Sequence, residues 1–279
     1  MKPLTWFNTV SGAALVAPQN TFMVESSVDS DAVFPGFVSF SIEFSSFPDF
    51  AGDSPCLLIQ DLVTDTYPSG NTTQPNSYSD ILLQNLGDIM GSRPYIRVGG
   101  NTQDHALYDA SLPYSLNGTI DPKRSPDYPT TIHIGPSYFQ SYKTWNDTDF
   151  IHGFNFGLGG NSSEGWQTLK DTVPLVCEAL GSRLAWWEYG NEPDLYSTSS
   201  HGPVRPANWT ESIFVDQWLN GTAMIATLLK EHCIDVSAND SHGYLAPSFG
   251  GLGNTLNEYK SWTGGLNKQG NIKLFSTHK

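Results

Sequence analysis

The chain has 279 residues, and with 38% hydrophobic and only 15% charged residues it can bury a core large enough for one sizeable domain. Its formal net charge of -14 disfavours binding to a nucleic-acid backbone, because no cluster of Lys or Arg offsets the repulsion between like charges. No run of roughly 18 apolar residues follows the N-terminal region, so the sequence predicts no membrane span.

Residues 1–20 have the outline of a signal peptide. A lysine precedes a mostly apolar stretch that ends in small residues near Ala17, as in a secretory leader. Asn8 and Thr9 interrupt the apolar stretch, and Pro18 would directly follow the cleavage site. A leader and an ordinary N-terminal strand therefore remain two alternatives for this segment.

Asn-x-Ser/Thr sequons give a stronger indication of secretion. Some matches are expected by chance in a polar chain, but together they favour a glycoprotein of the secretory pathway. We therefore expect an extracellular protein, glycosylated at some of these positions: Asn71, Asn117, Asn146, Asn161, Asn208, Asn220 and Asn239.

The cysteines do not indicate a metal site. Cys56, Cys177 and Cys233 form neither a CxxC pair nor any other metal-ligand spacing, so we expect no metal. Nothing in the sequence calls for a cofactor either. Cys177 and Cys233 each end a predicted helix and could pair there, with buried free thiols as the alternative.

Short apolar runs recur along the chain, as expected of parallel strands that are covered on both faces. Each run is bounded by polar or turn-forming residues. The sequence therefore predicts six strands, at Phe37–Phe44, Tyr95–Val98, Phe154–Leu158, Leu184–Tyr189, Tyr244–Phe249 and Ile272–Ser276.

Helical patterns lie between these strands. Apolar residues recur with helical spacing over Tyr78–Met90, Trp166–Leu180 and Ser212–Cys233, and Gly91 follows the first of these as a C-cap. Strands that alternate with helices in one series predict a parallel sheet, and the length of the series favours a closed α/β barrel of the (β/α)8 type.

A doubly wound nucleotide-binding fold is the competing architecture. It requires a glycine-rich phosphate loop after the first strand, and Phe44–Phe50 offers no such loop. The barrel is therefore the predicted fold. Residues 109–137 and 196–207 are rich in Pro, Ser, Asp and Tyr without periodicity, and we expect them to be loops on the face that carries the active site.

Catalytic groups of α/β barrels lie at the carboxyl ends of the strands, so the residues that follow each strand matter most. WEYGNEPD, which ends the fourth strand, resembles the Asn-Glu-Pro motif of retaining glycosidases built on α/β barrels. SIEFSSFPDF at the first strand and RPYIRVGGNTQD at the second narrow the resemblance to glycoside hydrolase family 79, the β-glucuronidases and heparanase-like enzymes, and especially to fungal members. The resemblance extends from about Phe34 to Lys279.

The resemblance implies a catalytic role for Glu192. A retaining glycosidase needs one carboxylic acid that protonates the leaving oxygen, and Glu192 matches this acid/base. Asn191 matches the residue that binds the 2-hydroxyl of the sugar, and Arg97 would lie beside the nucleophile and hold it ionised. Arg97 could instead simply pair with a barrel carboxylate. Glu188 is expected to be a structural ion-pair partner on the same strand face as Glu192.

Three further residues match family positions that touch the glycone sugar: Glu43, Asn101 and His278. Each also has a structural interpretation. Glu43 could be the ion-pair partner of Arg97, Asn101 could cap a turn, and His278 could be a core histidine with satisfied hydrogen bonds.

The nucleophile of this family follows the seventh strand. At the usual length of a βα unit it falls at roughly position 285 or beyond, so we expect no nucleophile in this chain. The resemblance implies that residues 34–279 are the N-terminal part of a barrel, with about six βα units and without the last strands and the C-terminal β-sandwich.

The implied function is hydrolysis of terminal glucuronic acid, or its 4-O-methyl form, from glycans, with this chain inactive by itself. One alternative is a non-catalytic carbohydrate-binding fragment or pseudoenzyme. Another is a glycosidase of the same barrel group that acts on a different sugar. The expected partner is a carbohydrate in every case, and the sequence predicts no oligomeric state.

Overall fold

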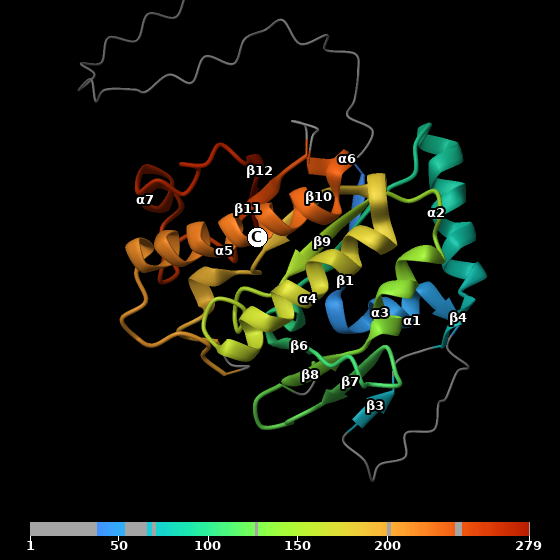
Figure 1. Ribbon diagram of the computed structural model, residues 1–279, viewed down its shortest axis with the longest axis horizontal. Coiled ribbons are helices and arrows are strands. Elements are labelled where there is room, and N and C mark those ends of the chain that lie inside the picture. The colour runs from blue at the N-terminus through green and yellow to red at the C-terminus, as the bar shows by residue number, and fades with distance from the viewer. Residues whose placement is uncertain are drawn as a thin grey trace, which may run out of the picture. The chain divides into compact units, whose positions relative to one another are not determined.

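A six-stranded parallel sheet forms the centre of the computed structural model, with the strand order β1-β5-β9-β10-β11-β12 (Figure 1). The structure describes residues 38–53, 66–68, 71–125, 128–199, 202–237 and 242–278, all within one compact unit, residues 35–279. The strands are β1 (Ser39–Glu43), β5 (Tyr95–Gly99), β9 (Phe150–Phe154), β10 (Leu184–Tyr189), β11 (Tyr244–Phe249) and β12 (Ile272–Thr277).

Five of the six predicted strands coincide with these elements, and the third was misplaced. Its strand is Phe150–Phe154, not Phe154–Leu158. The chain turns after Phe154, because side chains of Asp104 and Asn155 accept hydrogen bonds from the backbone N–H groups of residues 156–159. Backbone groups that bind side chains in this way cannot continue a strand ladder.

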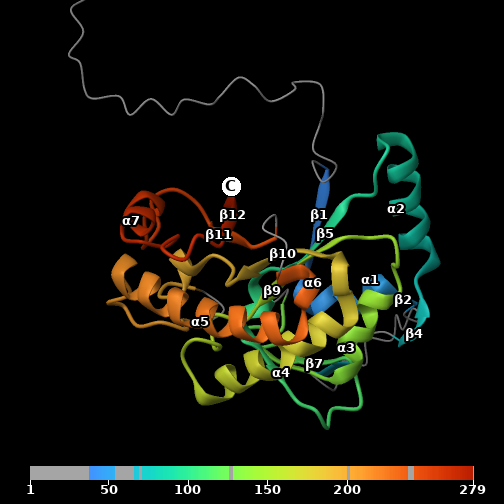
Figure 2. The same cartoon turned by 45° about the horizontal axis from the view of Figure 1, so that its top comes forward.

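Three long helices accompany the sheet: α2 (Ser77–Met90), α4 (Ser163–Leu180) and α5 (Glu211–His232). Each matches a predicted helix to within three residues. Asn76 caps α2 by accepting from Ser79 N, and the helix ends at Gly91, whose φ of 83° suits a residue without a side chain. Ser162 caps α4 in the same way. Helices α4 and α5 pack side by side against the sheet (Figures 1 and 2).

A disulfide between Cys177 and Cys233 joins the last turn of α4 to the residue that follows α5. Their Cα atoms are 5.3 Å apart, within the usual range for a disulfide. Cys177 and Cys233 therefore form a disulfide and are not buried free thiols, the alternative that the sequence left open.

Residues 109–137 contain regular structure, so the prediction of a loop there was wrong. Strand β7 (Leu116–Thr119) pairs antiparallel with β8 (Thr131–Ile134), in a sheet of order β3-β7-β8-β6. The inward side chains Ile132 and Ile134 are fully or almost fully buried, which explains why so short a strand is stable. The outer strands of this sheet are β3 (Thr66–Pro68) and β6 (Ala106–Tyr108). The described residues of 196–207 form no helix or strand, as predicted.

The remaining elements are short. They are β2 (Gly52–Asp53), β4 (Asn71–Pro75), α1 (Phe47–Ala51), α3 (Pro136–Gln140), α6 (Ile234–Ser237) and α7 (Glu258–Thr263). Aromatic rings of α1, α3 and the segment before β9 form one cluster with Phe150, the first residue of β9. They are Phe47, Tyr138, Tyr142 and Trp145.

Strands β1 and β12 form the two edges of the central sheet, β1 beside α2 and β12 beside α7 (Figure 2). Phe40 on β1 and Phe275 on β12 are 43% and 59% exposed. The described residues thus form an α/β fold with a curled parallel sheet of six strands, and the sheet is not closed into a ring within them.

Several predictions concern residues outside the described part of the chain. The leader at residues 1–20, the thiol of Cys56 and the sequon at Asn239 belong to this group. Among the described residues, no helix is both long and apolar enough to cross a bilayer.

Candidate active site

Glu192 lies just beyond the carboxyl end of β10, in a sharp turn. Gly190 has a φ of 90°, and Glu192 itself has a left-handed backbone with φ 50° and ψ 51°. This conformation costs a non-glycine residue about 1–2 kcal/mol, and residues held in it cluster at functional sites. A hydrogen bond from Glu192 N to the carbonyl oxygen of Ser248, 2.9 Å long, anchors the turn to β11.

The side chain of Glu192 reaches a pocket and contacts His278, the residue after β12. The Nδ1 atom of His278 is 2.9 Å from Oε1 of Glu192, and both side chains are about one quarter exposed. His278 is therefore not a core histidine. It holds one carboxylate oxygen of Glu192 and leaves the group accessible.

Asn191 is held at three points and is 5% exposed. Its backbone N–H donates to Oδ2 of Asp104 over 2.8 Å. Its side-chain Oδ1 accepts from Arg97 over 2.9 Å, and its Nδ2 donates to Oδ1 of Asn101, also over 2.9 Å. Residues from the ends of β5 and β10 are thus brought together as the sequence predicted, and the Asn191 side chain has one orientation.

Arg97 pairs with Glu188 across the inner face of the sheet. Its Nε and NH2 atoms lie 3.1 and 2.5 Å from Oε2 of Glu188, whose side chain is completely buried. Its NH1 donates to Ser41, which lies opposite Arg97 in the register of β1 and β5. Glu188 is the structural partner that the sequence predicted, and Glu43 does not fill that place.

Glu43, at the end of β1, is held by the turn after β5. Its Oε1 accepts from both the backbone N–H and the hydroxyl of Thr102, at 2.7 and 2.5 Å. Gly100, with a φ of 105°, passes so close that a Cβ atom there would collide with the Glu43 carboxylate. The glycine pair of the RVGGN motif therefore permits this close approach.

Asp104 is the residue of the site that the sequence interpretation missed. It is 2% exposed, and burial raises its pKa to about 6, although the nearby Tyr196 hydroxyl and the hydrogen bonds from the backbone N–H groups of Asn191, Gly157 and Phe156 lower it. Its position in the polar run RVGGNTQD after a strand was the available signal.

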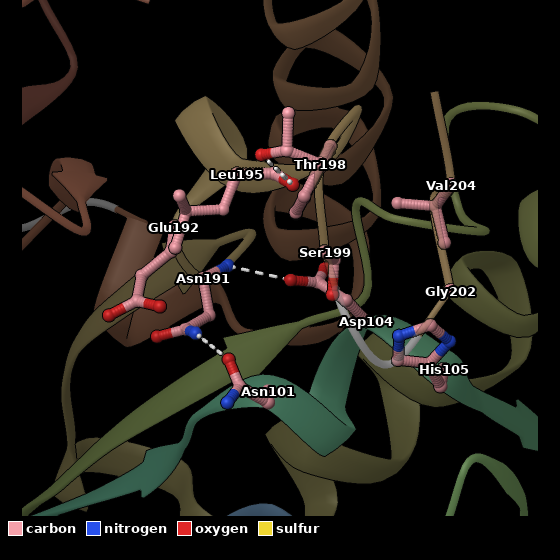
Figure 3. A pocket seen from close by; sticks show the side chains of 11 residues that line it. Asn101, Asp104, His105, Asn191, Glu192, Leu195, Thr198, Ser199, Gly202 and Val204 are labelled. Atoms are coloured by element: carbon pink, nitrogen blue, oxygen red, sulfur yellow. Dashed lines mark hydrogen bonds between the residues drawn. The ribbon is translucent and has the colours of Figure 1, made fainter. Parts of the chain in front are cut away.

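A cavity of about 280 Å³ lies between the turn after β5 and the loop after β10 (Figure 3). Figure 3 shows Glu192 and Asn191 on one side of the pocket and His105, Gly202 and Val204 on the other. Asn101, Asp104, Leu195, Tyr196, Thr198 and Ser199 complete the lining. Within the described part of the chain, no group of three or more His, Cys, Asp or Glu side chains could hold a metal ion.

The fold and the site define an α/β protein whose curled parallel sheet presents a glutamate and an asparagine, from adjacent positions, at the carboxyl ends of its strands. No family model matches the chain. It is 59% identical over 256 residues to a β-glucuronidase of Neurospora crassa and 49% identical over 259 residues to a β-glucuronidase of Aspergillus niger. These alignments cover 91% of the chain but only 43% and 44% of the relatives. The chain thus spans less than half the length of the curated relatives it matches.

The fold is also similar to that of a solved structure. A 4-O-α-L-rhamnosyl-β-D-glucuronidase from Fusarium oxysporum, in a Rha-GlcA complex, superposes with a TM-score of 0.60 at 23% sequence identity. The match covers 88% of this chain and 45% of that one. This similarity supports the α/β fold with a curled parallel sheet.

Proposed function

We propose that the chain is the part of a retaining glycoside hydrolase of family 79 that carries the acid/base. The proposed reaction is the hydrolysis of terminal glucuronic acid, or its 4-O-methyl form, from glycans. The observation that carries the proposal is the pair Asn191–Glu192, which is fixed at the end of β10 by Arg97, Asn101 and His278. The names of the two fungal relatives favour glucuronic acid as the sugar.

In the proposed mechanism, Glu192 protonates the leaving oxygen and later activates the water that completes hydrolysis. Asn191 binds the sugar 2-hydroxyl, a contact that strengthens in the transition state. His278 holds the Glu192 carboxylate in place and, with Glu43 and Asn101, contacts the glycone. Arg97 orients Asn191, in addition to the role beside the nucleophile that the family resemblance implies.

A retaining mechanism also requires a second carboxylate, about 5–5.5 Å from the first. Among the nearby glutamates of the described residues, Glu188 is completely buried beneath Arg97 and cannot reach a sugar, and Glu43 is held by Thr102 in the place of a glycone contact. We therefore propose that the nucleophile is not among the described residues. Separately, we propose that the 279-residue chain does not turn over a glucuronide by itself. A carbohydrate-binding role without catalysis is the second candidate function. The lack of a suitable nucleophile among the described residues favours it.

The test uses a hybrid protein in which this chain replaces the matching segment of the Neurospora crassa relative. The hybrid should hydrolyse aryl β-D-glucuronides, and the chain alone should not. Glu192→Gln in the hybrid should lower kcat by about 100-fold or more on a substrate with a poor leaving group, and much less on an activated aryl glucuronide, which needs no proton. Equal losses on both substrates would refute the acid/base role.

The second candidate function has its own measurement. If the chain only binds carbohydrate, calorimetric titration should show glucuronic acid binding to the chain, while the folded hybrid hydrolyses none of the glucuronides. Turnover of another aryl glycoside by the hybrid would instead assign a different sugar to the same site.

We also propose that the protein is a secreted glycoprotein. Asn161 and Asn208 are exposed and lie in loops, where an acceptor sequon is accessible. The disulfide between Cys177 and Cys233 fits an oxidising compartment.

A further inference from the structure

We infer that Asp104 is a positioning residue of this site: its buried carboxylate fixes the backbone of Asn191 and thereby the direction of the Glu192 side chain. The inference rests on the proposed function for its effect on turnover. Its structural part, the link between Asp104 and Asn191, stands independently of that proposal.

Asp104 joins the carboxyl ends of three neighbouring strands. It lies in the turn of 3-10 helix after β5, Asn101–His105. Its Oδ1 accepts from the backbone N–H groups of Phe156 and Gly157 after β9, each over 2.8 Å, and its Oδ2 accepts from Asn191 N after β10. One carboxylate thus fixes the turn that leads to Glu192 relative to the turns after β5 and β9.

The same turn after β9 is held from its other side by Arg205. The guanidinium donates to the carbonyl oxygens of Phe156 and Gly157, while Asp104 takes their N–H groups. Arg205 is 4% exposed and lies 5.0 Å from the centre of the Phe156 ring and 5.0 Å from that of Trp209. Between these two opposite charges, residues 156–157 form a rigid support for the catalytic turn.

The cost of burying Asp104 argues that its role is not stability. A buried carboxylate with raised pKa is stabilised less by its hydrogen bonds than it is destabilised by the loss of water. A buried group with a raised pKa that lines a cleft is a candidate for a functional role. Only a carboxylate can accept at both oxygens here, because an amide at this position would place its own N–H groups against backbone N–H groups.

The structural test is NMR spectroscopy of the uniformly 15N-labelled 279-residue chain. The amide resonances of Phe156, Gly157 and Asn191 should shift with one common midpoint near pH 6, as the charge on Asp104 appears. Other titratable or charged groups that face this carboxylate or the Asn191 turn are Tyr189, Tyr196, Arg205, His105, Glu192 and His278. Any shift that persists in Asp104→Asn reports one of them instead of Asp104.

A milder variant guards against loss of folding in Asp104→Asn. Tyr196→Phe removes a hydroxyl whose interaction lowers the pKa of Asp104, so the common midpoint should move to higher pH. Separate midpoints for the three amides, in the unaltered chain or in Tyr196→Phe, would overturn the link between Asp104 and Asn191.

The functional test uses the hybrid described above. Asp104→Asn should lower kcat by about 100-fold with a much smaller change in KM, because a misplaced acid and a misplaced Asn191, whose contact with the 2-hydroxyl strengthens in the transition state, act mainly on the chemical step. Asp109→Asn is the matched control, since Asp109 is half-buried, does not line the pocket, and its carboxylate binds only the neighbouring Ser111 among the hydrogen bonds described. It should leave kcat unchanged.

The outcomes are separable. If the unaltered hybrid is inactive, the proposed function is refuted. The NMR test then still decides whether Asp104 is linked to Asn191. An active hybrid in which Asp104→Asn keeps its kcat refutes the positioning role, even if the amides titrate together. A rise in KM with kcat unchanged would also refute it.

Discussion

The backbone N–H of Glu192 donates a hydrogen bond to the carbonyl oxygen of Ser248, and both residues have the left-handed backbone conformation that is rare outside glycine. Their φ values are 50° and 54°, and among the described residues no other non-glycine residue has a positive φ. Ser248 is completely buried at the end of β11, and its carbonyl oxygen receives the Glu192 N–H. The strained turn that carries Glu192 is thus held by a second strained residue on the next strand.

Substitutions at Ser248 should separate strain from packing. Ser248→Gly removes the steric cost of the left-handed backbone but adds freedom to the unfolded chain, so the free energy of unfolding should change by less than about 1 kcal/mol. Ser248→Val keeps the position buried but adds a β-branched side chain at positive φ, and should cost about 2 kcal/mol or more. Chemical denaturation followed by circular dichroism measures both. A valine variant as stable as the glycine variant would contradict this account.

Arg97 and Glu188 should show strong energetic coupling. Arg97→Met leaves the buried Glu188 carboxylate without its partner and should lower the free energy of unfolding by about 3–5 kcal/mol. The double variant Arg97→Met, Glu188→Leu contains no buried unpaired charge, so it should recover most of the free energy of unfolding that Arg97→Met loses. The measurement is a double-mutant cycle by denaturation. Additive effects of the two substitutions would show that the ion pair is not what stabilises this part of the sheet.

The stability of the protein should fall as Asp104 ionises. Because the folded-state pKa is raised from 3.8 to about 6, the protonated form is favoured by folding. The resulting stability is fully present below about pH 4 and is lost as the pH rises through about 6. The unaltered chain should therefore lose roughly 2–4 kcal/mol relative to Asp104→Asn over this interval.

Denaturation curves at intervals of pH from 4 to 7 test this expectation, with Asp109→Asn as the control. Hydrogen bonds from Ser111 lower the pKa of Asp109, so its effect on stability has the opposite sign, present at neutral pH and lost as the pH falls. The difference in free energy of unfolding between the unaltered chain and Asp104→Asn should vary with pH. If it does not, Asp104 is not buried in its ionised form.

Glycosylation should differ among the sequons. Asn161 and Asn208 are exposed in loops, and the Ser or Thr two residues later is exposed as well. We expect both to carry glycans when the chain is secreted from a fungal host. The Asn→Gln substitution at either position should lower the apparent mass on a denaturing gel by that of one glycan. Intact-mass analysis before and after treatment with an endoglycosidase measures the occupancy. An unmodified secreted chain would contradict the prediction.

Much of the central sheet was predictable because its strands are apolar runs bounded by polar residues. The misplaced strand shows where this signal fails. Phe154–Leu158 is as apolar as a strand, while the true strand Phe150–Phe154 contains His152, which sequence patterns place outside a core. His152 is buried because Tyr142 binds it, with 2.6 Å between the hydroxyl and Nδ1, and burial lowers its pKa to about 3. That partner cannot be predicted from spacing alone.

The site was partly predictable for a related reason. Glu192, Asn191 and Arg97 occur in motifs that directly follow strands, and the topology brings such positions together. Asp104 acts through backbone N–H groups of residues 52, 53 and 87 positions away, and no residue type marks a backbone donor. Its role became visible only once the strand ends were in place.

The sequon at Asn220 sets an order of events in the biosynthesis of this protein. Asn220 lies in the middle of α5, and the hydroxyl of Thr222, which the sequon requires, is buried between Leu219 and Gln269. An acceptor sequon is normally recognised in an accessible loop. A glycan at Asn220 would have to be attached while this stretch of the nascent chain is still unfolded, so its presence or absence in chain secreted from a fungal host reports whether glycosylation or helix formation came first.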